Sequence, residues 1–309
     1  MSNTSILVLG AGELGMAVLR PLAARAVLVP GTDIAVLLRP SSIASSDTAK
    51  QKDIAELRSL GIRLVPGDLA GPADDLPALF KDFDTVISCT GFVTGSGGFQ
   101  LRLTHAILDA GVRRYFPWQF GVDYDVIGRG SAQDLFTEQL DVRDLLRSQS
   151  RTEWVIVSTG IFTSFLFEPS FGVVDLAQNI VHALGSWETA VTVTTPKDIG
   201  ALTAEIVFAE PHVVNRVMYT AGDTVTYARL ANIVDAVLGR KVQRVEWSVP
   251  ELKAELAKDP KNGIKKYRVV FAEGKGVAWE MDQTFNAERG ISVMSVEQWA
   301  QANIEQAAP

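Results

Sequence analysis

The chain has 309 residues and a formal net charge of −7, with 47% hydrophobic and 21% charged side chains. These values are typical of a globular protein of one large domain or two modest ones. An acidic chain lacks the excess of Lys and Arg that nonspecific binding to nucleic acid or to an anionic membrane needs. Its single cysteine, Cys89, excludes an intramolecular disulfide and a thiolate metal site. No apolar run approaches the roughly 20 residues of a membrane helix, so we expect a cytoplasmic protein.

Short β-branched runs alternate with helical stretches through the first half of the chain. We predict strands at 6–9, 34–38, 62–65, 84–88, 114–117 and 154–158, and helices at 13–25, 50–60, 99–110 and 132–147. Continuous apolar strands separated by helices are typical of βαβ units, in which helices cover both faces of a parallel sheet. The sequence therefore predicts a doubly wound α/β fold.

The pattern changes near residue 160. A Phe-rich, irregular stretch precedes predicted helices at 197–210 and 227–238 and predicted strands at 217–220 and 242–247. We therefore place a first domain at 1–160 and a smaller α/β substrate lobe at 161–309, with segments around 190–225 returning to the first domain. The basic run from Lys258 to Arg268 contains Pro260 and Gly263, and we expect a solvated turn there rather than a nucleic-acid patch.

A glycine motif, Gly10-Ala-Gly12-Glu-Leu-Gly15, directly follows the first predicted strand and opens the first helix. The first glycine permits a tight turn, the second lets backbone N–H groups approach a pyrophosphate, and the third allows close helix–strand packing. The helix N-terminus adds a partial positive charge. In this context the motif predicts a dinucleotide site formed by five residues, and a glycine turn without a ligand is the alternative. The five are Gly10, Gly12, Glu13, Leu14 and Gly15.

The end of the second predicted strand indicates which dinucleotide binds. An NAD site places Asp or Glu there to hold the ribose hydroxyls, whereas this strand continues through Arg39 to Ser41 and Ser42 without an acid. Arg39 can stack on adenine and pair with a 2′-phosphate, and Lys50 adds a second positive charge. We therefore predict NADPH as the cofactor and a Rossmann domain that binds it. For Arg39, a solvated charge at the strand end is the alternative.

Several further motifs carry a resemblance to a known family. They are Gly67-Asp68-Leu69, Gln100-Leu101, the stretches 110–117 and 120–123, the segment from Ser158 to Phe162, and the stretches 198–200 and 215–239. With the glycine loop and Arg39, they make the chain similar to the NmrA-like, isoflavone reductase-like group of atypical short-chain dehydrogenases over nearly its whole length. That group includes the plant pinoresinol–lariciresinol and phenylcoumaran benzylic ether reductases. The resemblance implies an extended Rossmann fold, NADPH and a small aromatic, phenylpropanoid-like substrate.

The chain departs from the pattern of this family at four positions. The plant reductases carry Pro-Ser-Glu-Phe-Gly where this chain has Pro-Trp-Gln-Phe-Gly at 117–121. The catalytic lysine of the family corresponds to Gln139, and its asparagine after the sixth strand corresponds to Gly160. Because an amide can neither donate a proton as an ammonium group does nor act as a general base, the redox chemistry does not transfer by residue identity.

Gln139 is still a catalytic candidate. It falls on one helical stripe with Leu135, Val142 and Leu146, so its amide either bonds to neighbouring backbone or faces the nicotinamide pocket and orients a substrate carbonyl or a water. Two other candidates are Tyr124 and Asp123. Tyr124 would act as a phenolic acid, and Asp123 would protonate an imine as a carboxylic acid or capture an iminium as a carboxylate. Packing of Tyr124 and helix capping by Asp123 are the alternatives.

Other candidates follow predicted strand ends, where sites open in α/β folds. We assign to the cofactor Thr90, Gly91, Phe92, Gln119, Gly160 and Phe162. We assign to an aromatic substrate wall Trp118, Phe120, Phe165 and Phe167, although a lobe interface explains the last two equally well. His105 is expected to face the core with a backbone partner and Cys89 to be inert, and no carboxylate cluster with metal spacing accompanies the histidines.

Together these inferences point to an NADPH-dependent oxidoreductase of secondary metabolism. Its substrate would be a small aromatic or alkaloid-like molecule that is reduced at C=O, C=N or activated C=C. Two alternatives stay open: a noncatalytic NADP(H)-binding redox sensor of the NmrA type with a protein partner, favoured by the absent lysine, and a non-redox cyclase in the same pocket. A homodimer is one assembly that the sequence leaves open.

Overall fold

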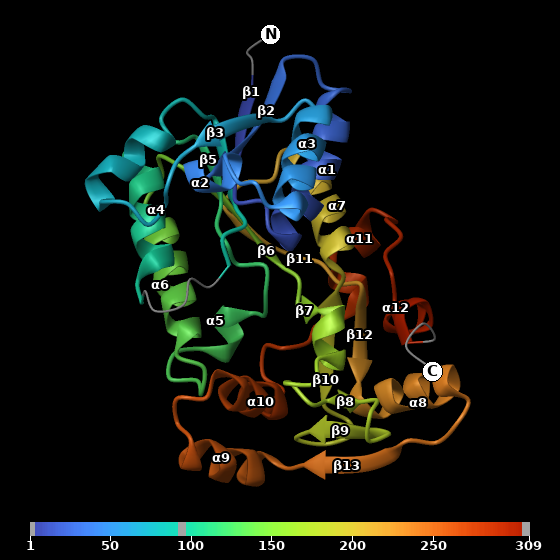
Figure 1. Ribbon diagram of the computed structural model, residues 1–309. Coiled ribbons are helices and arrows are strands. Elements are labelled where there is room, and N and C mark those ends of the chain that lie inside the picture. Colours follow the sequence, from blue (N-terminus) through green and yellow to red (C-terminus); the bar gives the residue numbers. More distant parts are fainter. Residues whose placement is uncertain (1–3, 92–96, 305–309) are drawn as a thin grey trace. The chain divides into compact units, whose positions relative to one another are not determined.

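The computed structural model describes residues 4–91 and 97–304, and these form two compact units (Figure 1). The first unit comprises residues 1–119, 141–157 and 199–217, and the second comprises 120–140, 158–198 and 218–309. The segment 199–217 thus clusters with the first unit and 120–140 with the second. The functional division at residue 160, with segments around 190–225 returning to the first domain, stays a prediction.

The first unit is built on a seven-stranded sheet in the order β11-β6-β5-β4-β1-β2-β3. The strands are β1 (Thr4–Leu9), β2 (Thr32–Leu38), β3 (Arg63–Pro66), β4 (Thr85–Ser88), β5 (Arg114–Phe116), β6 (Glu153–Ser158) and β11 (Arg216–Tyr219). β1 pairs in parallel with β2 on one side and β4 on the other. The strand order therefore reverses between β1 and β4, and in such sheets ligands bind at the carboxyl ends of the strands at this point.

Helices cover both faces of this sheet (Figure 1). α1 (Glu13–Ala26), α3 (Thr48–Ser59) and α7 (Pro196–Val207) lie on one face, and α4 (Phe99–Asp109) and α6 (Leu135–Arg147) lie on the other. Arg20 of α1 pairs with Glu56 of α3 at 2.6 Å, and Arg25 of α1 pairs with Glu205 of α7 at 2.7 Å. Because both faces are covered, β1 is fully apolar and buried from Ile6 to Leu9. The doubly wound fold is confirmed.

The second unit contains two three-stranded sheets, β12-β10-β7 and β13-β9-β8. Their strands are β7 (Ile161–Phe162), β8 (Val174–Asp175), β9 (Ile180–Leu184), β10 (Ala190–Thr194), β12 (Asp223–Thr226) and β13 (Gln243–Trp247). The helices are α5 (Tyr124–Ile127), α8 (Tyr227–Leu238), α9 (Val249–Lys258), α10 (Gly263–Glu273), α11 (Phe285–Glu288) and α12 (Val296–Ile304). Its core is a cluster around Phe171, Tyr227 and Phe271, each fully or almost fully buried.

Two predictions from the sequence are wrong. The basic run was expected to be a turn, and only its residues 259–262 are one. From Gly263 the chain forms α10, because Asn262 caps the helix by accepting the N–H of Lys265 and the helix buries Val269 to Ala272. His105 was expected to face the core, but it is exposed, because α4 buries the face that carries Leu103, Thr104 and Ile107. In the first case Pro260 and Gly263 marked the turn before the helix and not the whole run, and in the second the spacing of a few hydrophobic residues did not show which helical face is covered.

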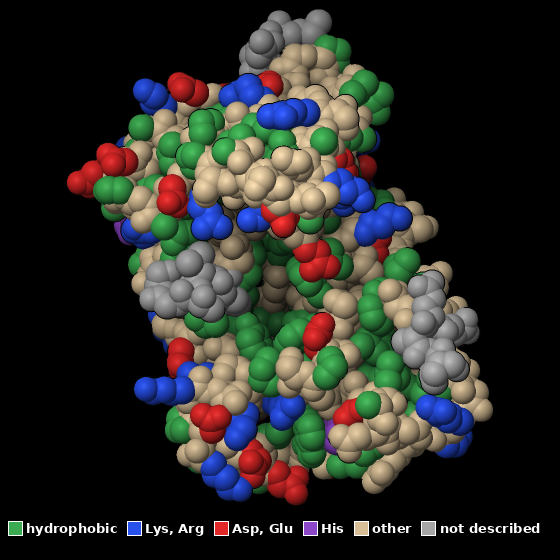
Figure 2. Space-filling model, in the orientation of Figure 1, with side chains coloured by type: hydrophobic (Ala, Val, Ile, Leu, Met, Phe, Trp, Pro, Cys, Tyr) green, Lys and Arg blue, Asp and Glu red, His purple; other side chains and the backbone are tan. Residues whose placement is uncertain are grey.

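The described surface carries charges of both signs. In the view of Figure 2, Lys and Arg side chains are interspersed with Asp and Glu, and neither sign forms a continuous field on that face. Within residues 4–91 and 97–304, no helix is both long enough and apolar enough to span a bilayer.

The packing of α7 against α1 gives a first testable prediction. A Cβ at Gly200 would lie 1.8 Å from the carbonyl oxygen of Ala17, a backbone atom that cannot move aside. We therefore expect Gly200→Ala to lower the free energy of unfolding by about 3 kcal/mol or more, measured by urea denaturation. Gly263→Ala is the control, because a Cβ there meets nothing within 4 Å. Equal stability of the two variants would contradict the close approach.

Asp235 in α8 gives a second prediction, on pH. Burial opposes its ionisation, but hydrogen bonds from the N–H of Val242 and from the side chains of Lys241 and Arg244 outweigh burial and hold its pKa below the ordinary value. The ionised carboxylate therefore stabilises the fold above the unfolded-state pKa, and this stabilisation is lost as pH falls through the lower native pKa.

We expect Asp235→Asn to cost about 2 kcal/mol at pH 7. The difference from wild type should shrink below about pH 4, as measured by denaturant unfolding at both pH values. Asp282→Asn, at an exposed position, is the matched control. A deficit of Asp235→Asn that is the same at pH 7 and pH 3 would show that the charge of Asp235 is not the cause.

Candidate cofactor-binding site

A pocket of about 1050 Å³ opens in the first unit at the carboxyl ends of four neighbouring strands. This is where the strand order predicts a ligand site. The pocket is lined by the ends of these strands and the loops that follow them: Gly10, Ala11 and Gly12 after β1, Leu37, Leu38, Arg39 and Ser42 at and after the end of β2, Gly67, Asp68, Leu69 and Ala70 after β3, and Cys89 and Thr90 after β4. Two helices complete it: α3 with Lys50, Asp53, Ile54 and Leu57, and the start of α4 with Gly97, Gly98, Phe99 and Arg102.

The glycine loop has the geometry that its sequence predicts. Gly10 adopts a φ of +92°, which only glycine adopts readily. Gly12 lies open to the pocket, since a Cβ added there would meet nothing within 4 Å, so a ligand can come close to its backbone. A Cβ at Gly15 would lie 2.2 Å from the carbonyl oxygen of Gly10. Glu13 and Leu14 form the first turn of α1 and do not line the pocket.

Two cationic side chains proposed for the 2′-phosphate line the pocket. Arg39 and Lys50 both line it and are exposed, and Ser42 lies beside them. Arg39 precedes the short helix α2 (Pro40–Ile43), and its carbonyl oxygen accepts the N–H of Ser42. Ser41 belongs to the same helix but does not line the pocket. The structure therefore brings together three of the residues proposed for a 2′-phosphate.

Two polar residues of α4 hold the loops after β3 and β4, and the sequence analysis assigned neither to the site. Gln100 is buried and donates to the carbonyl oxygen of Gly91 at 2.9 Å and to Oγ1 of Thr90 at 3.2 Å. Arg102 donates to the carbonyl oxygens of Leu69 at 3.0 Å and Gly71 at 3.1 Å. Both lie in the first turn of the helix that follows the fourth strand, and Gln100 also belongs to the Gln100-Leu101 motif of the resemblance. These two sequence signals could have pointed to them.

The residues that directly follow β4 include three that the sequence assigned to the cofactor, Thr90, Gly91 and Phe92. Thr90 lines the pocket, and Gly91, at φ +71°, turns the chain beside it. Phe92 lies outside the described residues. Cys89 also lines the pocket but is 8% exposed, and burial raises the pKa of its thiol, which disfavours the reactive thiolate. This agrees with the expectation that Cys89 is inert.

The side chain of Gln119 is hydrogen-bonded to a buried arginine. Its Oε1 accepts a hydrogen bond from Nε of Arg143 at 2.7 Å, and the two side chains are 1% and 0% exposed. Gln119 does not line the described pocket, whereas Trp118 beside it is half-buried. Gln139 is fully buried and lies one helical turn before Arg143 on α6.

Asp123 and Tyr124 have structural contacts within the second unit. Asp123 caps α5 by accepting the N–H groups of Asp125 and Val126, and it also accepts the hydroxyl of Tyr219 at 2.7 Å. Tyr124 is 3% exposed and packs edge-on against Phe136 with 5.0 Å between ring centroids. Asp123 therefore caps a helix and Tyr124 packs in the core, which are the alternatives to a catalytic role.

Gly160 explains the missing asparagine in steric terms. It adopts a φ of +70°, and a Cβ there would lie 1.9 Å from the carbonyl oxygen of Thr192. Its own N–H donates to the carbonyl oxygen of Gly121 at 3.0 Å. Neither a side chain nor a free backbone donor is thus offered to a cofactor at this position.

The aromatic residues of the second unit are packed against one another. Phe165 stacks on Phe171 with 4.5 Å between centroids, and Phe167 stacks on Trp299 with 4.6 Å. Phe120 is 8% exposed, and Phe162 is half-buried in β7. Packing therefore accounts for Phe165 and Phe167, and their assignment to a substrate wall stays a prediction. Among the described residues, no group of three or more His, Cys, Asp or Glu side chains could hold a metal ion.

Comparison with known proteins agrees with the resemblance inferred from sequence. The model of the NmrA-like family matches residues 2–299. An NmrA-like family domain-containing oxidoreductase from Gibberella moniliformis is 47% identical over 298 residues, which cover 96% of this chain and 97% of that protein. Phenylcoumaran benzylic ether reductase Pyrc5 from Pyrus communis is 28% identical over 265 residues, covering 82% and 83% of the two chains.

Solved structures share the fold. The crystal structure of isoflavone reductase superposes with a TM-score of 0.80 at 18% identity and covers 98% of this chain and 99% of that one. Structures of pinoresinol–lariciresinol and phenylcoumaran benzylic ether reductases give a TM-score of 0.78 at 19% identity, with the same coverage. The chain therefore belongs to the NmrA-like family and has the extended Rossmann fold of the isoflavone reductases.

Proposed function

We propose that this protein is an NADPH-dependent reductase of a small aromatic substrate, acting on C=O, C=N or activated C=C. The observation that carries the proposal is the pocket at the strand ends, which is lined both by the open glycine loop and by Arg39 and Lys50. A pyrophosphate fits the first feature and a 2′-phosphate fits the second.

The residues of the pocket fit NADPH. Gly12 and the N-terminus of α1 would hold the pyrophosphate, and Arg39, Ser42 and Lys50 would surround the 2′-phosphate. When bound, NADPH supplies a hydride. Asp53 also lines the pocket, but it lies on α3 one turn after Lys50 rather than at the end of β2, where an NAD site places its acid.

The names of similar proteins support the same proposal. The relative from Gibberella moniliformis is called an oxidoreductase. One structure of the same fold is described as AtPrR2 with NADP+ and (+)pinoresinol, and another as a binary complex of leucoanthocyanidin reductase with NADPH from Vitis vinifera. An aromatic substrate and NADPH are therefore proposed for this chain by analogy with those proteins.

Gln139 limits the reactions that this chain can carry out. A buried amide can donate a hydrogen bond to a carbonyl oxygen and orient it, but it cannot deliver a proton. Hydride acceptors whose carbon is already electrophilic, such as an iminium, need no protein acid at that step. We therefore place such substrates ahead of ketones that require protonation.

A noncatalytic redox sensor is the second candidate, and Gln139 is the observation that favours it. A sensor would bind NADPH and NADP+ with clearly different affinities and would turn over neither imines nor aromatic carbonyls. The reductase would consume NADPH with at least one of these substrates.

The cofactor assignment predicts the effect of Arg39→Ala. Loss of the guanidinium should weaken NADPH and NADP+ binding about tenfold or more, because a charge-assisted contact to the 2′-phosphate disappears. Binding of NADH and NAD+ should change much less. Calorimetric titration of the four dinucleotides checks this, with Arg63→Ala, an exposed arginine on β3 paired with Asp33, as control. Dinucleotide binding that ignores the phosphate would refute the assignment.

The role of Gln139 predicts a separation of binding from turnover. Gln139→Leu should lower kcat for an aromatic iminium or carbonyl substrate about 10- to 100-fold while NADPH affinity stays the same, because only substrate orientation is lost. Steady-state kinetics and NADPH titration measure the two quantities, and Thr137→Ala on the same helix is the control. Unchanged kcat in Gln139→Leu would remove Gln139 from the mechanism.

A further inference from the structure

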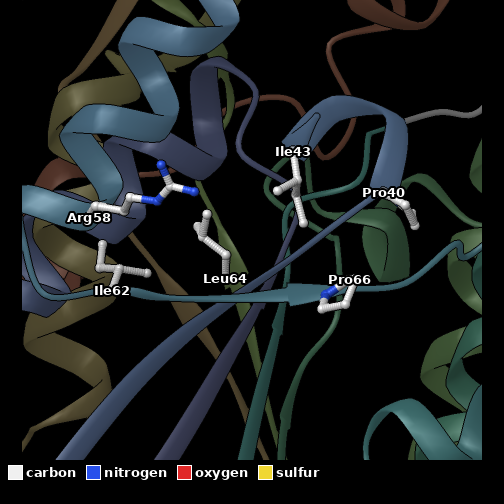
Figure 3. Close-up of a pocket in the computed structure, with 6 residues that line it drawn as sticks. All are labelled: Pro40, Ile43, Arg58, Ile62, Leu64 and Pro66. Carbon is white, nitrogen blue, oxygen red and sulfur yellow. The ribbon is translucent and has the colours of Figure 1, made fainter. Parts of the chain in front are cut away.

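A second pocket lies at the end of the sheet in the first unit, beyond the cofactor pocket. It has a volume of about 480 Å³ and is lined by Pro40, Ile43, Arg58, Ile62, Leu64 and Pro66 (Figure 3). We call these six residues the edge groove, because β3 is the last strand of the seven-stranded sheet.

Two apolar walls of the edge groove face each other. Residues two apart on a strand share a face, so Leu64 and Pro66 of β3 lie on one side. Ile62 directly precedes the strand and also lines the groove. Pro40 and Ile43 are three apart on α2 and form the other wall. In Figure 3, the side chain of Ile43 extends from α2 toward β3, between Leu64 and Pro66. The groove can therefore hold a flat or extended apolar group between the two elements.

A single positive charge closes one end of the groove. Arg58, in the last turn of α3, reaches over Ile62 toward Leu64 (Figure 3). Its side chain makes no hydrogen bond or ion pair with any described residue, whereas the nearby Arg20 and Arg63 are paired with Glu56 and Asp33. A cation without a protein partner beside apolar walls is complementary to an amphipathic anion.

We propose that the edge groove binds a small amphipathic carboxylate. The carboxylate pairs with Arg58, and the apolar body lies between Ile43 and Leu64. One cation favours one negative charge, and the volume lies at the small end of the range for ligand pockets.

α2 separates the groove from the cofactor pocket. Arg39 and Ser42 line the cofactor pocket, and Pro40 and Ile43 line the groove. A ligand packed against Pro40 and Ile43 restricts α2 and thereby holds Arg39 and Ser42 in place. An occupied groove therefore increases NADPH affinity, and by thermodynamic linkage NADPH increases affinity for the carboxylate. This coupling rests on the proposed function, whereas binding in the groove does not.

The first test measures binding to the full chain without NADPH. The probes are 3-phenylpropionate and its uncharged amide, titrated by ligand-observed NMR. We expect the carboxylate to bind with a Kd on the order of 1 mM or below, and the amide at least about tenfold more weakly. Arg58→Gln and Ile43→Ser should each weaken carboxylate binding about tenfold. Arg63→Gln is the control and should not weaken it, because Arg63 lies on β3 but does not line the groove.

Three results would overturn the site. The carboxylate and its amide could bind equally, Arg58→Gln and Ile43→Ser could both retain wild-type affinity, or Arg63→Gln could weaken binding as much as Arg58→Gln does. The second result would place the probe elsewhere on the chain, and the third would show general attraction to surface charge.

The second test measures the coupling. NADPH is titrated with and without saturating 3-phenylpropionate, and we expect about fivefold tighter binding with the probe present, with the effect lost in Ile43→Ser. Unchanged or weaker NADPH binding would overturn the coupling and leave the groove supported by the first test. If NADPH does not bind at all, the proposed function fails. The first test is made without NADPH, so it still shows whether the edge groove binds the carboxylate.

Discussion

The position of α1 is fixed by two contacts in which its backbone meets another backbone with no side chain between them. At its first turn, Gly15 packs against the carbonyl of Gly10, and farther along the helix Ala17 meets Gly200 of α7. A methyl group at either glycine would push the elements apart, and interiors packed at this density have no room to absorb such a shift. The open side of Gly12 follows from these contacts, because the helix N-terminus is held directly above the carboxyl end of β1.

Other parts of the pocket are held in place by hydrogen bonds from one helix to the loops beside it. Gln100 and Arg102 donate to backbone carbonyls of the loops after β4 and β3, so two loops that carry pocket residues are tied to one helix. The part that carries Arg39 is built differently, since α2 is only four residues long and its residues are exposed or half-buried.

The sequence predicted the first half of the fold well, because buried parallel strands and their helices have strong periodic patterns. β1, β2, β4 and α1 all lie within about two residues of their predicted bounds. Between residues 161 and 196 it predicted no regular structure, yet β7, β8, β9 and β10 are there. Strands of two to five residues are too short for period-two spacing to stand out, and their pairing depends on segments distant in the chain.

The site was predictable to the same degree. Glycine spacing and the absence of an acid after β2 pointed to Gly10, Gly12, Arg39 and Lys50, which all line the pocket. Local sequence could not show that Arg102 reaches the β3 loop, nor that the N–H of Gly160 is already used. Those contacts join residues that are 33 and 39 positions apart, and only the folded backbone brings them together.

The two glutamines that replace charged residues of the plant motifs are best understood as a pair. The resemblance aligns Gln119 with a glutamate and Gln139 with a lysine, so the two exchanges together leave the net charge of the motif unchanged. Gln119 accepts from the fully buried Arg143, and Gln139 lies one turn before that arginine. A lysine there would place a second buried cation one turn from the guanidinium, without a carboxylate at residue 119 to offset either charge. Loss of the lysine is thus compatible with a buried arginine that is held by an amide.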